Sequence, residues 1–320
     1  MDNPQAPNNS PDWERRTLEK LAFAALDEQK SRRRWGIFFK AIGFIYLLVV
    51  LFAVVDWGSD TEHQERHTAM VSLNGVIQSK GEANAEKLMA ALQSAFEEKN
   101  SVGVVLRINS PGGSPVQAGM INDEIHRLRA KYPEKPLYAV VEDMCASGGY
   151  YVAVAADKIY VNKASIVGSI GVLMDGFGFT GTMDKLGVER RLLTAGESKG
   201  FLDPFSPQAE THKAHAQTML NDIHQQFIDV VKTGRGQRLK ESPEMFSGLM
   251  WTGLQSVQLG LADEIGSVDS VARDVIKAEK VLDYSLKDNI AERFAKRLGA
   301  GAVNGFWNGF FETQMGTSLR

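Results

Sequence analysis

Short apolar runs alternate with amphipathic segments over most of the chain. The runs at residues 71–77, 103–108 and 137–141 predict strands, because brief apolar runs are typical of buried strands. Residues 83–99 have the spacing of an amphipathic helix, and residues 150–156 open another apolar helix. Strands that alternate with helices are typical of a mostly parallel sheet with crossover connections. We therefore place the chain in the α/β class.

Two of the predicted strands are followed by turns that contain glycine. Residues 110–113, Ser-Pro-Gly-Gly, form the first turn, with Ser114 as the N-cap of the next helix and Pro115 as its first residue. Residues 144–149 form the second turn. Each turn leads from a strand into a helix, so both are expected at the carboxyl edge of the sheet.

Three more elements complete the expected domain. Strands are predicted over residues 158–161 and 191–193, and a long helix begins after Ser206-Pro207 with its apolar residues on one side. No internal repeat or low-complexity tract interrupts this order.

One continuous apolar segment lies near the N-terminus. Between residues 35 and 55 the only charged side chain is Lys40, and a helix of this length can cross a bilayer. Eight Lys or Arg residues lie in the first forty positions, and acidic residues follow the segment. We therefore expect one transmembrane anchor with a cytoplasmic N-terminus. A cleaved secretory signal is the alternative, although no Ala-x-Ala-like cleavage site follows the segment.

The composition narrows the possible functions. The formal net charge is −3, which argues against general nucleic-acid binding. The single cysteine, Cys145, excludes an intrachain disulfide, and the six histidines show no metal-ligand spacing. We expect no bound metal.

Ser147 is the candidate nucleophile. It lies in Ala-Ser-Gly-Gly-Tyr at residues 146–150, where the glycines permit a tight strand-to-helix turn beside unpaired helix amides. The glycines of the turn at 110–113 add a second set of amides, and two facing sets resemble an oxyanion hole. Cys145 is an alternative thiol nucleophile.

The base that would activate Ser147 is harder to find. His212, His215 and His224 fall in the long helix after Pro207, and His126 lies on the helix after the first turn, so all four are expected on solvated faces. A lysine with a lowered pKa can also act as a base. Lys199, in a loop of small residues, is the candidate.

The whole pattern resembles the signal peptide peptidase A (SppA) family of membrane-anchored serine peptidases. The likeness covers about residues 70–275 and is carried by five motifs in family order: RINSPGG at 107–113, ASGGYY at 146–151, VGSIGV at 167–172, SK at 198–199 with DPF at 203–205, and GLADEIG at 260–266. It implies the ClpP/crotonase fold, a spiral of ββα units, preceded by one transmembrane helix.

The resemblance also implies a role for each site residue. Ser147 would be the nucleophile and Lys199 the general base, in a Ser/Lys dyad. The amides of Gly113 and Gly148 would form the oxyanion hole, and the Ser169 hydroxyl would orient Lys199. No cofactor is implied.

The implied activity is a serine endopeptidase that degrades signal-peptide remnants or other short apolar peptides. The peptide is expected to add as a strand between two segments of the chain, which contribute Gly112, Gly168, Ile170, Gly171 and Val172. The family's ring-like assembly implies a homo-oligomer whose active sites face a shared interior.

The sequence thus divides into five expected parts. These are a cytoplasmic segment at 1–34, the anchor at 35–56, a linker at 57–69, the peptidase domain at 70–280 and an aromatic C-terminal tail at 281–320. The expected location is the bacterial inner membrane, with the domain periplasmic or extracellular.

Two alternative functions remain open on the same fold. One is an inactive, membrane-tethered binding or scaffold protein, and the other is a crotonase-like acyl-CoA enzyme, which an extracytoplasmic location disfavours. The tail is expected to pack on a neighbour, to touch the membrane, or to dock on its own chain.

Overall fold

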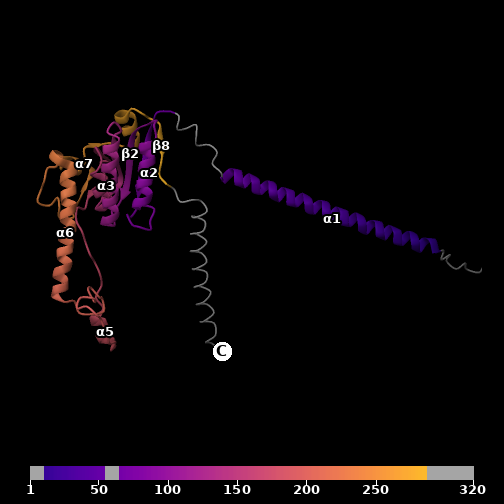
Figure 1. Cartoon of the computed structure of the whole chain (residues 1–320), viewed down its shortest axis with the longest axis horizontal. Helices are drawn as coiled ribbons and strands as arrows, with labels where there is room; N and C mark the ends of the chain where they lie inside the picture. Colours follow the sequence, from indigo (N-terminus) through magenta and orange to yellow (C-terminus); the bar gives the residue numbers. More distant parts are fainter. Residues whose placement is uncertain (1–10, 55–64, 287–320) are drawn as a thin grey trace, which may run out of the picture. The chain divides into compact units, whose positions relative to one another are not determined.

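The computed structural model describes residues 11–54 and 65–286, so the predicted C-terminal tail lies almost wholly outside the described residues. The chain divides into two units, residues 1–64 and 65–320, and each is described by itself. In the first unit the described residues form one helix, α1 (Pro11–Val54) (Figure 1).

The predicted membrane anchor is not supported. Among the described residues no helix is long and apolar enough to cross a membrane. The location of the second unit outside the cytoplasm stays a prediction.

The second unit is built around one sheet, which confirms the α/β class. Its order is β6-β5-β3-β2-β1-β8, with β4 beside β3 and β7 beside β4. All neighbours are parallel except β5 and β6. The strands are β1 (His67–Asn74), β2 (Ser101–Ser110), β3 (Leu137–Ala146), β4 (Lys158–Val161), β5 (Ile166–Gly168), β6 (Met250–Thr252), β7 (Glu264–Ile265) and β8 (Val281–Asp283).

The helices include those that the sequence predicts. They are α2 (Ala85–Glu97), α3 (Pro115–Lys131), α4 (Gly148–Ala153), α5 (Thr180–Leu186), α6 (Glu210–Arg235), α7 (Gly253–Gln258) and α8 (Val268–Ser270), with the 3₁₀ turn η2 (Gly236–Arg238) and the π-helical turn η3 (Val271–Ile276). The predicted cap of α3 is confirmed, because the Ser114 side chain accepts a hydrogen bond from Gln117 N. The strand predicted at residues 191–193 is wrong, since that stretch forms neither strand nor helix.

The two faces of the sheet are covered unequally. Leu106 and Ile108 of β2 point into the main core, which α2 and α3 cover. Val105 points to the other face and packs in a small cluster with Val140 and with Val271 of η3. The alternation along β2 follows from the period of two in a strand.

Strand β3 changes its neighbour halfway along. Its first half pairs with β4 as far as Val141, and its last three residues pair with β5. Between the pairs Ile108↔Val141 and Ser110↔Cys145, one residue of β2 faces three residues of β3, at 142–144. This bulge moves the end of β3 onto β5. The strand therefore continues to Ala146 through what the sequence predicts as a turn.

A buried ion pair fixes α6 to the sheet. Arg235, which is 1% exposed, donates to both carboxylate oxygens of Asp263 at 2.8 and 2.9 Å. Asp263 Oδ2 also accepts from Ile159 N of β4 at 2.7 Å. Burial alone would raise the pKa of the Asp263 carboxyl, but these hydrogen bonds and the positive charges of Arg235 and Arg238 hold that pKa below its ordinary value.

We expect Asp263→Asn to lower the free energy of unfolding by about 3–5 kcal/mol at neutral pH, because it leaves the Arg235 charge buried without a partner. A carboxylate with a depressed pKa stabilises the fold above its unfolded pKa of about 4 and loses that effect as the pH falls through the folded value. The difference from wild type, measured by urea unfolding, should therefore narrow below about pH 4. Asp274→Asn, in an exposed pair with Arg273, is the control and should change little.

Candidate active site

Ser147 occupies the turn that the sequence predicts between β3 and α4. Its φ of 50° and ψ of −123° lie in a region that non-glycine residues rarely adopt. Its amide donates to Gly168 O at 2.8 Å, and its carbonyl accepts from Tyr151 N at 3.0 Å. The half-buried side chain is thus held by β5 on one side and α4 on the other. Strained backbone of this kind is concentrated at functional sites.

The glycine turn after β2 lies directly against Ser147. A Cβ atom added to Gly112 would lie 2.7 Å from Ser147 Cβ and 2.6 Å from Gly148 N. Such contacts are closer than any side chain tolerates, so glycine is required at this position. The two turns that the sequence predicts at one edge of the sheet therefore do meet.

The amides of Gly113 and Gly148 lie close together next to Ser147. Ile77 N donates to Gly112 O and Ile77 O accepts from Ser114 N, so the intervening Gly113 N–H is left pointing away from Ile77. A Cβ on Gly148 would lie 3.3 Å from Gly113 N. Neither amide has an acceptor among the described residues, and the Gly148 amide lies in the first turn of α4, where helix amides have no partner within the helix. Two such donors suit an oxyanion.

Ser110 supports the glycine turn, and sequence reasoning missed it. Its buried hydroxyl donates to Gly75 O at 2.7 Å and accepts from Gly112 N at 3.1 Å. A Cβ on Gly149 would lie 3.1 Å from Ser110 O, so the residue also packs beneath the start of α4. Its position just before Pro-Gly-Gly was the feature of the sequence that could have pointed to this supporting role.

The segment after β5 forms the opposite side of the site. Gly168 pairs with Ala146, and a Cβ on Gly168 would lie 2.6 Å from the Trp251 ring. Ser169 is half-buried with a φ of 52°, and its amide donates to Leu249 O at 2.7 Å. Ile170 is fully buried, and its carbonyl lies 3.2 Å from His224 Nε2. Gly171 and Val172 follow, both half-buried.

Lys199 is not brought to Ser147. It is exposed, and Phe201 beside it packs on His212 and His215 in the first turns of α6. Helix α6 touches α4 farther along, where the rings of Phe227 and Tyr151 lie 5.2 Å apart. The fifteen residues from His212 to Phe227 rise about 22 Å along the helix axis. Figure 1 shows the end of α6 that begins at Glu210 away from α3.

No hydrogen bond in the described part of the chain joins the Lys199 amine to Ser147 or to Ser169. The roles of Lys199 and Ser169 stay predictions. Among the described residues no hydrogen bond joins His126 on α3 or His212 on α6 to Ser147.

Cys145 is a poor alternative nucleophile. It is fully buried, and desolvation raises the pKa of its thiol far above the ordinary value. The reactive thiolate is therefore suppressed. Within the described residues no group of three His, Cys, Asp or Glu side chains could hold a metal ion.

Comparison with known proteins supports the resemblance to the SppA family. The sequence pattern of peptidase family S49 matches residues 129–282. A protein of Enterococcus faecium named putative signal peptide peptidase SppA is 32% identical over 66% of this chain and 63% of its own length. A probable protease SohB of Haemophilus influenzae is 30% identical over 68% of this chain and 61% of its own. The chain is thus similar to peptidase family S49, and its resemblance to the SppA proteins is confirmed.

Other relatives match only in part. A Brucella melitensis protein named Na(+)/H(+) antiporter NhaA is 42% identical over 214 residues, which are 65% of this chain but 29% of that protein. The chain thus spans less than two thirds of the first relatives it matches. A solved structure of a membrane-bound stomatin-specific protease mutant covers 70% of this chain at 12% identity, with a TM-score of 0.44.

Ser110→Ala should slow the covalent labelling of Ser147 by a fluorophosphonate about tenfold, because Gly112 N loses its acceptor and the glycine turn loosens. Ser256→Ala is the matched control, since Ser256 is also fully buried and donates to a backbone carbonyl, Gly253 O. Labelling rates and circular dichroism would be compared for the two variants. Equal labelling in wild type and Ser110→Ala would show that the turn holds its shape without this hydroxyl.

Proposed function

We propose that this protein is a serine endopeptidase that acts by acyl transfer through Ser147. The observation that carries the proposal is that the Gly113 and Gly148 amides, which have no acceptor among the described residues, lie close together next to a strained, half-buried serine. The hydroxyl oxygen attacks the peptide carbonyl and its proton passes to a base. The amides receive the oxyanion, the amine leaves with a proton, and water then hydrolyses the ester.

The base in this proposal is Lys199, and a neighbouring copy of the chain supplies it. Within one chain the lysine lies at the far end of α6 from Ser147. The segment around it carries large apolar side chains that are strongly exposed, namely Leu173, Phe177, Leu186 and Leu193. Exposed apolar surface of this extent is typical of a site that another protein covers. A ring-like homo-oligomer would cover it and bring each amine to a Ser147 hydroxyl, with Ser169 as the residue that orients the amine.

The proposed substrates are extended apolar peptides such as signal-peptide remnants. Exposed Val76, Val116 and Met120 flank the glycine turn, and exposed Leu249 and Met250 lie next to the Gly168 segment. A peptide that adds as a strand between the two segments would place alternate side chains on these apolar surfaces. The name of the Enterococcus relative supports the same substrate class.

The alternative is a binding protein without turnover on the same fold. It is favoured by the distance between Lys199 and Ser147 in the single chain. Labelling of the serine separates the two functions, because only an activated hydroxyl reacts readily with a fluorophosphonate.

Wild-type protein should be labelled at one site per chain by a fluorophosphonate, and Ser147→Ala should abolish both the labelling and the hydrolysis of an apolar peptide. Intact-mass measurement and peptide mapping would locate the adduct. Ser169→Ala, which keeps the nucleophile, is expected to label slowly. A wild-type protein that stays unlabelled while correctly folded would favour the binding protein.

Lys199→Ala should lose nearly all hydrolysis, and so should Ser147→Ala, but a mixture of the two variants assembled together should regain activity. The reason is that a copy with an intact serine would meet a neighbour with an intact lysine. The variant that carries both Ser147→Ala and Lys199→Ala is the control and should stay inactive. A mixture as inactive as its components would contradict the supply of the lysine by a neighbour, and an active Lys199→Ala would remove the lysine from the mechanism.

A further inference from the structure

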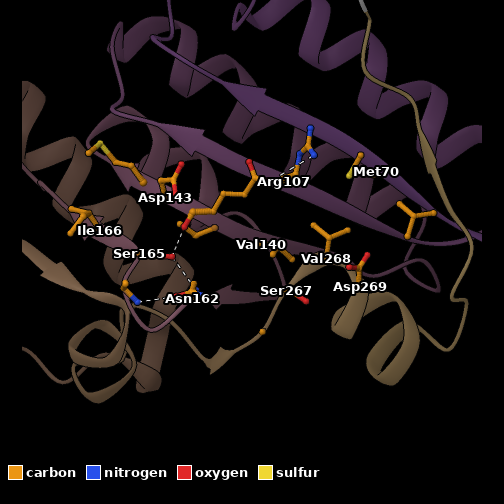
Figure 2. Close-up of a pocket in the computed structure, with 16 residues that line it drawn as sticks. Met70, Arg107, Val140, Asp143, Asn162, Ser165, Ile166, Ser267, Val268 and Asp269 are labelled. Carbon is orange, nitrogen blue, oxygen red and sulfur yellow. Dashed lines mark hydrogen bonds and ion pairs between the residues drawn. The ribbon is translucent and has the colours of Figure 1, made fainter.

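A cavity of about 880 Å³ lies on the less covered face of the sheet, and the proposed reaction does not use it. Figure 2 shows Met70, Arg107 and Val140 projecting into it from β1, β2 and β3, with Val268 and Asp269 of α8 opposite. The small cluster around Val271 packs next to the cavity, and Val140 and Val268 belong to both. The cavity is the part of this face that the cluster leaves uncovered.

Polar groups of this face lack partners in the described part of the chain. Arg107 Nε is buried without a hydrogen-bond acceptor, and Arg107 Nη1 lies 3.7 Å from Glu142 Oε1, too far for a hydrogen bond. Ser72, which pairs with Arg107 in the β1–β2 register, also has a buried hydroxyl without a partner. Buried polar groups without partners are costly, so this face is incomplete as described.

The lining defines the chemistry of a suitable occupant. Its charged side chains are Arg107, Glu142, Asp143 and Asp269, so carboxylates outnumber the cation. Its floor is apolar, formed by Met70, Val140, Val268 and Val281. A matching segment would carry both basic and large apolar side chains.

The chain itself leads to this face. After β8, Tyr284 N donates to Met70 O at 2.8 Å, and Ser285 Oγ accepts from Ser72 N at 2.9 Å. The 34 residues that follow Leu286 contain five Lys or Arg against three Asp or Glu. They also contain Phe294, Phe306, Trp307, Phe310 and Phe311.

We propose that residues 287–320 dock into this cavity of their own chain, with the basic stretch at 293–297 against the carboxylates and aromatic side chains on the apolar floor. The segment starts two residues beyond Ser285, the last described contact with β1, so docking requires little additional chain to become ordered. Attraction between opposite charges and burial of apolar surface would both stabilise the docked segment, as in other segments that bind through aromatic side chains.

The test is hydrogen exchange on the full chain carrying Arg293→Glu, Lys296→Glu and Arg297→Glu together. Exchange of the amides at residues 142–144 and 267–269 should speed up about tenfold, because the charges that face Glu142, Asp143 and Asp269 are reversed. Adding Asp269→Lys to this triple variant should restore protection. Arg32→Glu, Arg33→Glu and Arg34→Glu together, in α1, are the matched charge control and should leave these amides unchanged.

Mixing two variants distinguishes docking of the segment within its own chain from docking onto a neighbouring copy. The triple variant mixed with the Asp269→Lys variant should stay unprotected, because each segment remains with its own cavity. Unchanged exchange in the triple variant, or no restoration by Asp269→Lys, would overturn the proposal. Restoration in the mixture would also overturn it and would assign the cavity to a neighbouring copy. These readouts do not depend on peptide hydrolysis.

Discussion

The candidate active site depends on strand β3, which pairs with β4 along its first half and with β5 at its end. If β3 kept the register that it has with β4, its end would lie away from β5, and Ser147 N would have no route to Gly168 O. The bulge at residues 142–144 makes the change of partner possible. Two hydrogen bonds hold it in place: Ser165 Oγ donates to Glu142 O, and Asn109 Nδ2 donates to Asp143 Oδ2 at 3.0 Å. The loop between β4 and β5 and strand β2 therefore both stabilise the bulge that leads to the nucleophile.

Close approach of the backbone makes glycine necessary at several points around Ser147. Gly112 meets Gly148 and Gly168 meets Trp251, at separations that leave no room for a Cβ atom. These close contacts bring backbone amides next to Ser147, where there is no room for a side chain that could donate a hydrogen bond. In the same unit the GLADEIG motif has a different purpose, since a Cβ on Gly260 would clash with Arg238 O and Asp263 anchors α6. That motif stabilises the fold and lies outside the site.

Local pattern was enough to predict the α/β class, the cap at Ser114 and the meeting of the two glycine turns. It was not enough for the bulge, because the sequence predicts a strand that ends at residue 141 and a turn that begins at residue 144, and that pattern does not record the pairing of residues 144–146 with β5. The strand predicted at 191–193 failed because its apolar side chains have no sheet to pack on; Leu193 is 97% exposed. Ser110 and the distance of Lys199 from Ser147 depend on contacts between residues far apart in sequence, and no periodicity records such contacts.

The enclosure of Cys145 has a practical consequence. It is the only cysteine in the sequence, it is fully buried, and burial raises the pKa of its thiol. Reagents that react with thiolates are therefore expected to leave the natural protein unmodified. A cysteine placed anywhere on its surface becomes the sole point of attachment for a fluorophore or a spin label, so motion of the Lys199 segment can be followed without first removing a native residue.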